Sequence, residues 1–223
     1  PEAPPEPLDD MFDVDNTAWS GREEPAKAPE QQAWSGTEDF GGAEGAAGLH
    51  DNWDDPDGYY RVMLGEKLQQ RYQIFAILGR GIFATVVRAR DLQQNGREVA
   101  IKIARRQETM YKAGMREISI LQRLSEADPD NKMFIVHFFT HFEHRGHLCM
   151  VFESLGLNLR EIVKRFGKDV GLNLQAVKTY TKQMLLALAL LREKQFVHAD
   201  IKPDNILVNE AKTIAKLADF GSA

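Results

Sequence analysis

The sequence predicts an α+β fold in which a small β-rich lobe precedes a helical lobe. Three short β-rich runs beginning at Tyr72 are separated by tight glycine-containing segments, which predicts an antiparallel meander: YQIFAILG, ATVVRARD and REVAIKIA. Beyond residue 156 the chain is rich in helix-forming segments instead, namely NLREIVKRFG and LQAVKTYTKQMLLALALLREK.

One helix and two further strands complete the predicted β-rich lobe. The run KAGMREISILQRL places Met115, Ile118, Leu121 and Leu124 at the spacing of an amphipathic helix. The runs FIVHFF and HLCMVF bring the sheet to five strands. The second run contains Cys149, the one cysteine of the sequence, whose apolar setting predicts a buried thiol.

Charge divides the chain into a tail and a domain. Residues 1–58 hold sixteen Asp and Glu against two Lys and Arg, which gives them a net charge of −14. The whole chain has a net charge of −5, so the remaining residues carry +9. We predict a disordered acidic tail over 1–58 and a folded domain over 59–223, with lobes at about 72–155 and 156–223. The tail repeats AWSG, with Ser20 and Ser35 as possible phosphorylation sites, although a local duplication without function explains the repeat as well. No apolar run is long enough to span a bilayer.

The turn between the first two strands could bind phosphate. In LGRGIFATVV, Gly79 and Gly81 let the backbone approach an anion with its N–H groups turned inward, and Ala84 stands where a third glycine would be expected. An ordinary glycine hairpin turn is an equally good explanation of this pattern alone.

A lysine inside an apolar strand needs a partner. Lys102 in VAIK lies between Ile101 and Ile103, and an unpaired buried ammonium is costly. Its natural partner is Glu117 on the amphipathic helix, which could hold the ammonium against a nucleotide's phosphates. The alternative is an edge-strand lysine that reaches solvent.

Two polar motifs near the end of the sequence could carry the chemistry. HADIKPDN supplies Asp200, Lys202 and Asn205, and LADFG supplies Asp219. Asp200 could accept a proton from an attacking hydroxyl, and the oxygens of Asn205 and Asp219 could hold Mg²⁺. Each motif alone could be a polar turn, but four motifs in this order favour a catalytic site.

Together these motifs resemble the signature set of the protein kinase family, over about Tyr72 to the end of the sequence. The resemblance implies a bilobal kinase fold, ATP and Mg²⁺ as cofactors, Asp200 as catalytic base, Lys202 beside it, and a Lys102–Glu117 pair. It implies that Asn205 and Asp219 bind the metal. It also implies a nucleotide site formed by Leu78, Gly79, Arg80, Gly81, Ile82, Phe83, Ala84, Val86, Ala100, Lys102, Phe152 as gatekeeper, Glu153 and Leu155 as hinge, Asn205, Leu207 and Asp219.

Finer features are similar to one branch of that family. VFESLGLNLREIV and DFGSA resemble the CMGC group, and DDPDGYYRVMLGE and HADIKPDNILVNEAKT resemble the pre-mRNA-processing factor 4 kinases of that group. This resemblance implies a nuclear serine/threonine kinase that phosphorylates splicing factors and associates with the spliceosome. It implies neither sequence-specific nucleic-acid binding nor membrane association. A catalytically silent nucleotide-binding or scaffolding module is the alternative.

Two departures from the family pattern lead to further expectations. The sequence stops at Ala223, two residues after DFG, so we expect residues 1–223 alone to be inactive and poorly soluble. Ala199 stands where most kinases have an arginine that binds an activation-segment phosphate, so we expect activity to depend less on such a phosphate.

Overall fold

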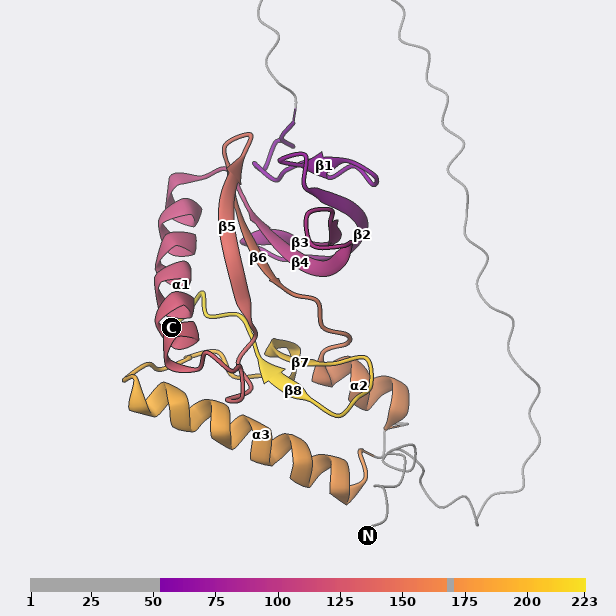
Figure 1. Ribbon diagram of the computed structural model, residues 1–223, viewed down its shortest axis with the longest axis vertical. Coiled ribbons are helices and arrows are strands. Elements are labelled where there is room, and N and C mark those ends of the chain that lie inside the picture. Colours follow the sequence, from indigo (N-terminus) through magenta and orange to yellow (C-terminus); the bar gives the residue numbers. More distant parts are fainter. Residues whose placement is uncertain (1–52, 168–170) are drawn as a thin grey trace, which may run out of the picture.

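The computed structural model describes residues 53–167 and 171–223, and it shows a sheet with one long helix above a smaller helical region (Figure 1). The sheet is antiparallel, with the order β1-β2-β3-β4-β6-β5. Its strands are β1 (Lys67–Leu68), β2 (Tyr72–Arg80), β3 (Ala84–Asp91), β4 (Arg97–Ala104), β5 (Phe138–His144) and β6 (His147–Glu153). The predicted α+β fold class is confirmed, but the predicted five strands are six, because the two-residue β1 is too short to leave an alternating pattern.

The start of β5 differs from the sequence prediction. Residues 134–137 were expected to begin this strand, but they bond to the other lobe instead. The Val136 N–H donates to the Leu217 carbonyl at 2.9 Å, and the Leu217 N–H donates to the Phe134 carbonyl at 2.9 Å. This linker therefore ties the end of the N-lobe helix to the C-lobe.

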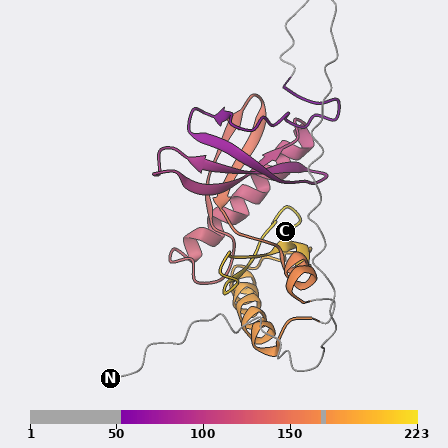
Figure 2. The same cartoon turned by 90° about the vertical axis from the view of Figure 1, so that its right-hand side faces the viewer.

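Helix α1 (Glu108–Ala127) covers one face of the sheet, as the view in Figure 2 shows. Ile118, Leu121 and Leu124 are buried as predicted, whereas Met115 is 37% exposed. The close contact is made instead at Gly114, where an added Cβ would lie 2.6 Å from Leu148 Cδ2. A larger residue at this position would therefore force the buried Leu148 side chain of β6 to shift.

The C-lobe elements are short except for one helix. They are α2 (Leu159–Phe166), α3 (Leu174–Glu193), the 3₁₀ turn η2 (Pro203–Asn205), β7 (Ile206–Val208) and β8 (Ala215–Leu217). Asn158 and Glu161 form a capping box that begins α2, with the Asn158 Oδ1 accepting from the Glu161 N–H at 2.9 Å. Asn173 begins α3 in the same way by accepting from the Ala176 N–H at 2.8 Å.

Two hydrophobic clusters form the core. One is made mainly by side chains of the sheet strands and includes Val99, Ile101 and Ile103 of β4. The other runs from α1 through β7 and β8 to α3. Because side chains alternate along a strand, Ala100 and Lys102 point away from the first cluster. This alternation places Lys102 on the side of the sheet that faces α1 and the C-lobe.

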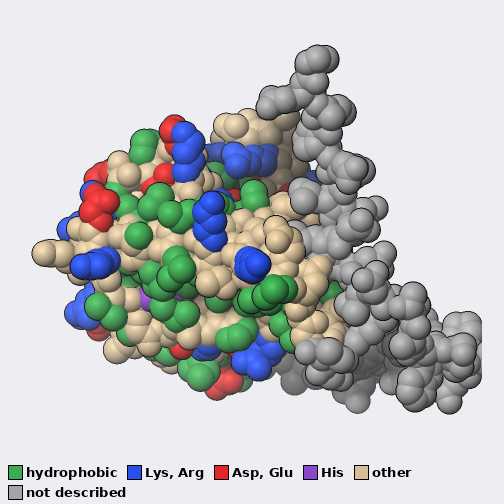
Figure 3. Space-filling model, turned by 90° about the horizontal axis from the view of Figure 1, so that it is seen from below, with side chains coloured by type: hydrophobic (Ala, Val, Ile, Leu, Met, Phe, Trp, Pro, Cys, Tyr) green, Lys and Arg blue, Asp and Glu red, His purple; other side chains and the backbone are tan. Residues whose placement is uncertain are grey.

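Helix α3 packs with one side only. Ala187, Leu190 and Leu191 are buried, whereas Leu174, Val177 and Leu185 are 67%, 43% and 60% exposed. Seen from below, hydrophobic side chains lie among Lys and Arg side chains on this surface (Figure 3). The exposed apolar surface agrees with the expectation from the sequence, although poor solubility stays a prediction. Within the described residues, no helix is both long and apolar enough to cross a membrane.

The segment before β1 is packed onto the sheet. Residues 53–58 were assigned to the disordered tail, yet Asp54 Oδ1 lies 2.7 Å from His147 Nε2 and the Gly58 carbonyl accepts from the Arg106 N–H at 2.8 Å. For these six residues the prediction of disorder is therefore corrected, because specific polar partners on the sheet order a segment that has no periodic pattern. The AWSG repeats lie outside the described residues, and the domain division itself stays a prediction.

Candidate active site

The glycine-containing turn connects β2 to β3 and projects from the sheet. Gly79 pairs with Val86 and Arg80 with Thr85, and the Gly81 N–H donates to the Ala84 carbonyl at 2.9 Å. Ile82 and Phe83 at its tip are 73% and 60% exposed. A Cβ built at Gly79 would meet no atom within 4 Å, so the packing of this chain does not require glycine there. Open space beside the backbone is what a phosphate-binding loop needs.

Three of the predicted adenine contacts, Val86, Ala100 and Phe152, share one face of the sheet. Directly opposed residues of antiparallel strands point to the same side, and Val86 opposes Lys102 while Ala100 opposes Phe152. Leu78 lies one residue before the glycine turn and is 47% exposed. On the other lobe, Leu207 of β7 is joined by an isolated bridge to Asn158.

Lys102 forms the ion pair that was predicted and a second one that was not. Its Nζ lies 2.9 and 2.8 Å from Glu117 Oε1 and Oε2, and 2.9 Å from Asp219 Oδ1. Burial favours a lower pKa for Lys102, but the charges and hydrogen bonds of the two carboxylates outweigh it and raise this pKa. Burial likewise favours a higher pKa for Asp219, and the charge of Lys102 outweighs it, so that this pKa is lowered. Three elements therefore meet at one charged ammonium.

Asp200 is held by the residues that follow it. Its Oδ2 accepts from Lys202 Nζ at 2.8 Å and from Asn205 Nδ2 at 2.9 Å, and its carbonyl accepts from the same Nδ2 at 2.9 Å. The hydrogen bond from Lys202 lowers the pKa of Asp200, and Asp200 in turn raises the pKa of Lys202. A carboxylate that stays ionised can accept a proton, and the neighbouring ammonium can stabilise negative charge.

Asn205 and Asp219 are brought together by a hairpin. In the β7–β8 pairing Ile206 opposes Leu217, and the Ala218 N–H donates to the Asn205 carbonyl at 2.9 Å. The side-chain hydrogen bonds of Asn205 are both made by its Nδ2, which donates to Asp200. Its side-chain oxygen has no hydrogen-bond partner among residues 53–167 and 171–223. An open amide oxygen and a carboxylate carried by neighbouring positions of one hairpin fit the preference of Mg²⁺ for oxygen ligands, and water and phosphate would supply the other ligands.

In the connection between the lobes, the Glu153 side chain is bound by the protein, whereas the Leu155 backbone N–H is open. Glu153 ends β6, and its Oε1 accepts from Lys216 Nζ at 2.6 Å and from the His137 N–H at 2.6 Å. The Leu155 carbonyl accepts from Arg88 Nη2 at 2.9 Å, but no acceptor in the described residues contacts the Leu155 N–H. That N–H is free to donate to a ligand, whereas the Glu153 carboxylate is occupied by the protein.

The sequence did not reveal the roles of two buried groups. His198 is 2% exposed, and its Nε2 lies 3.0 Å from the Ala218 carbonyl while its Nδ1 accepts from the Asp200 N–H at 3.3 Å. The neutral tautomer protonated at Nε2 satisfies both contacts and ties the loop that carries Asp200 to the residue before Asp219. Lys216 was missed as well, although its apolar neighbours in IAKLA are the same signal that drew attention to Lys102.

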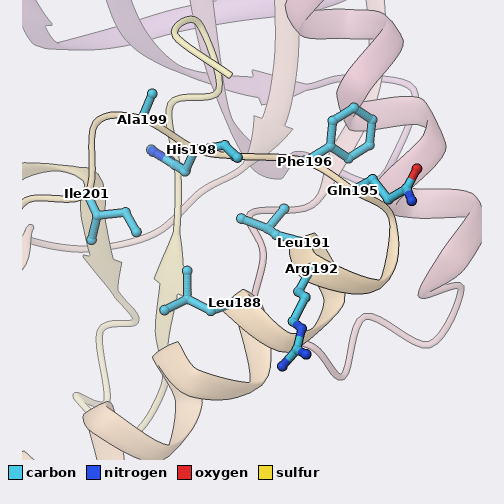
Figure 4. Close-up of a pocket in the computed structure, with 9 residues that line it drawn as sticks. Leu188, Leu191, Arg192, Gln195, Phe196, His198, Ala199 and Ile201 are labelled. Atoms are coloured by element: carbon cyan, nitrogen blue, oxygen red, sulfur yellow. The ribbon is translucent and has the colours of Figure 1, made fainter.

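A separate apolar hollow of about 660 Å³ lies between the end of α3 and residues 195–201, next to the loop that carries Asp200. Figure 4 shows Leu188, Leu191 and Ile201 around it. Ala199 also lines it and has a positive φ of 61°, an unusual conformation for a residue other than glycine. The charged groups at Lys102 and Asp200 do not line this hollow.

Comparisons with known proteins agree with this geometry. Residues 72–223 match the protein kinase domain. The chain is 53% identical over 177 residues to the serine/threonine-protein kinase prp4 of Schizosaccharomyces pombe, covering 79% of this chain and 37% of that protein. It is 47% identical over 177 residues to the serine/threonine-protein kinase prpf4B of Dictyostelium discoideum, covering 78% and 22%. It is 39% identical over 172 residues to the DYRK-family kinase pom1 of S. pombe, covering 77% and 16%.

The chain thus spans less than two fifths of the length of these relatives. The resemblance to the protein kinases, and within them to the pre-mRNA-processing factor 4 kinases, is confirmed by the match and by the relatives. This chain belongs to the protein kinase domain family.

Proposed function

We propose that residues 72–155 and 156–223 form the N-lobe and the first part of the C-lobe of an ATP-dependent serine/threonine protein kinase. The observation that carries the proposal is the convergence of Glu117 and Asp219 on Lys102, from a helix and a hairpin on opposite sides of the site. A structural ion pair would need one carboxylate. A second carboxylate on the same ammonium is expected where phosphates and a metal ion are to be bound.

The nucleotide would lie between the lobes. Its adenine would pack between Leu78, Val86 and Ala100 from the sheet and Leu207 from β7, beside Phe152. The open Leu155 N–H supports a backbone hydrogen bond to the base. The turn from Gly79 to Ala84 would cover the phosphates, with Lys102 as their cation.

Phosphoryl transfer would use the ionised Asp200. It would accept the proton of the substrate hydroxyl, while Asn205 fixes its position through one hydrogen bond to the carboxylate and one to the backbone carbonyl of Asp200. Lys202 supplies positive charge next to the transferred group. Bound through Asn205 and Asp219, Mg²⁺ would neutralise phosphate charge.

The proposed substrates are serines and threonines of proline- or arginine-rich splicing proteins in the nucleus. The resemblance to the pre-mRNA-processing factor 4 kinases supports this assignment, as does the similarity to relatives named prp4 and prpf4B. Association with spliceosomal complexes is proposed on the same basis.

The test uses the full-length protein that contains this chain. It is incubated with labelled Mg·ATP and a nuclear splicing-protein fraction, beside the Asp200→Asn variant, and the phosphoamino acids are identified. We expect phosphoserine and phosphothreonine with the wild type and a near loss of both with the variant. Mainly phosphotyrosine on these proteins, or equal labelling by both forms, would refute the proposal.

A further inference from the structure

The segment before β1 contacts the glycine-containing turn directly. We call residues 53–61 the N-terminal flank. The Tyr59 hydroxyl lies 2.9 Å from the Gly81 carbonyl and 3.0 Å from the Ile82 carbonyl. A phenol has one proton, so this donor is shared between the two carbonyls. Tyr59 lies outside residues 72–223, the part of the chain that matches the protein kinase domain.

Charged side chains fix Tyr59 in this place. The guanidinium groups of Arg80 and Arg105 lie over its ring, 3.7 and 4.6 Å from the ring centre. Arg80 Nη2 also donates to Asp55 Oδ2 at 2.6 Å, and Arg105 Nη1 donates to the Ile82 carbonyl at 3.2 Å. Asp55 Oδ1 in turn accepts from the Tyr59 N–H at 2.9 Å, which shapes the turn of the flank that presents Tyr59.

The flank is itself attached to the sheet away from the glycine turn. His147 is fully buried, and its two ring nitrogens face the Asp54 carboxylate at 2.7 Å and the Ala104 carbonyl at 2.8 Å. Arg145 lies over the Trp53 ring, 3.2 Å from its centre. The flank therefore bridges the β4–β6 part of the sheet and the glycine-containing turn that protrudes from it.

The direction of the carbonyls decides the direction of the amides. In a trans peptide the C=O and N–H point to opposite sides, and no peptide of the described chain is cis. Holding the Gly81 and Ile82 carbonyls toward Tyr59 turns the N–H groups of Ile82 and Phe83 away from it. Neither N–H has an acceptor within the described residues. Two adjacent open donors are what a phosphate group requires.

We propose that Tyr59 is a positioning residue for the nucleotide phosphates. By holding two carbonyls of the glycine turn, it keeps the Ile82 and Phe83 amides aimed at ATP. This inference rests on the proposed function, because it assigns the turn to phosphate binding. It adds a determinant of ATP affinity that lies outside the residues matching the kinase domain.

The test compares Tyr59→Phe with Tyr60→Phe in the full-length protein. Tyr60 is the adjacent residue, and its hydroxyl donates to Glu66 at 2.8 Å rather than to the glycine turn. Tyr59→Phe keeps the ring under the guanidinium groups and removes only the hydroxyl. We expect it to raise the KM and dissociation constant for Mg·ATP about threefold to tenfold, with little change in kcat. Tyr60→Phe should leave both ATP constants unchanged.

Adenosine separates an effect on phosphates from a general one. It lacks phosphates, so its dissociation constant should be the same for wild type and Tyr59→Phe. Amide hydrogen exchange in residues 80–84 should also become faster in Tyr59→Phe alone. Unchanged ATP affinity in Tyr59→Phe, or an equal loss in Tyr60→Phe or for adenosine, overturns the inference.

These readouts keep the two proposals apart. Binding measurements do not require turnover, so a wild type that binds ATP but transfers no phosphate refutes the proposed function while Tyr59 is still tested. A wild type that does not bind ATP overturns both.

Discussion

The two lysine–carboxylate groups of the site differ in what holds them. Lys102 and Glu117 have side chains that are 18% and 5% exposed, and they come from β4 and α1. Lys202 and Asp200 are 47% and 36% exposed and are two residues apart. The first group exists only when sheet, helix and hairpin are assembled, whereas the second is formed by one loop. Removing a charge should therefore affect stability at the first group and chemistry alone at the second.

The largest effect on catalysis is expected from Asp200→Asn. The amide cannot take the substrate proton, so kcat should fall about 100- to 10,000-fold. The free energy of unfolding should barely change, because the side chain is more than a third exposed and the substitution keeps its shape. Steady-state kinetics and urea denaturation of the full-length protein measure both. A kcat within tenfold of wild type would contradict the assigned role.

Lys102→Met should reduce both activity and stability. Loss of the phosphate-binding cation should lower kcat/KM about 100- to 1000-fold. Glu117 would be left buried without its partner, which should lower the free energy of unfolding by about 3–5 kcal/mol.

The matched control for this variant is Lys102→Met combined with Glu117→Gln. The double variant removes the unpaired charge of Glu117, so the free energy of unfolding should partly recover. The activity should stay as low as in the single variant. If the single variant unfolds at the same urea concentration as wild type, the contrast between the two groups is wrong.

Lys202→Met should have a smaller effect, with kcat reduced roughly tenfold by the loss of one charged hydrogen bond. The hydrogen bond from Lys202 lowers the pKa of Asp200, so without it that pKa should rise toward its ordinary value. Because the base acts when ionised, activity is lost as the pH falls through this pKa. The acid side of the kcat–pH profile should therefore move to higher pH. An unmoved profile would show that Lys202 does not control the ionisation of Asp200.

The smallest effect is expected at Ala199. Alanine carries no donor for an activation-segment phosphate, so phosphatase treatment of the full-length protein should lower activity only modestly. Ala199→Arg should make the same treatment more inhibitory. Matched phosphorylated and dephosphorylated samples of both forms give the comparison. Complete silencing of the wild type, together with no effect of the substitution, would show that Ala199 does not mark a different mode of control.

Sequence patterns predicted those elements whose bounds are set by residues close together in the sequence. Strands β3 and β4 have the predicted bounds because glycine turns and β-rich runs define them. The start of β5 was wrong because residues 134–136 pair with Leu217, which is distant in sequence. Met115 fits the helical spacing yet is 37% exposed, because hydrophobic periodicity does not register a glycine, and Gly114 is the neighbouring residue that is buried against the sheet.

The same distinction applies to the site. The residues of the Asp200 loop could be assigned from one motif, and Glu117 from the need of Lys102 for a partner. The contact between Asp219 and Lys102 depends on how the lobes dock, and the contact of Tyr59 depends on a flank without periodicity. Neither leaves a signal in the local sequence.

The buried pair of Glu153 and Lys216 has a consequence for how the cleft opens. It joins the end of β6 to β8, so it links the two lobes close to the point where the chain passes between them. When two bodies rotate about an axis, atoms near the axis move least. If the two lobes rotated apart about this point, the Glu153–Lys216 ion pair would move little and would stay formed. The Lys102–Asp219 ion pair, which also joins the two lobes, would then be the first of the two to break.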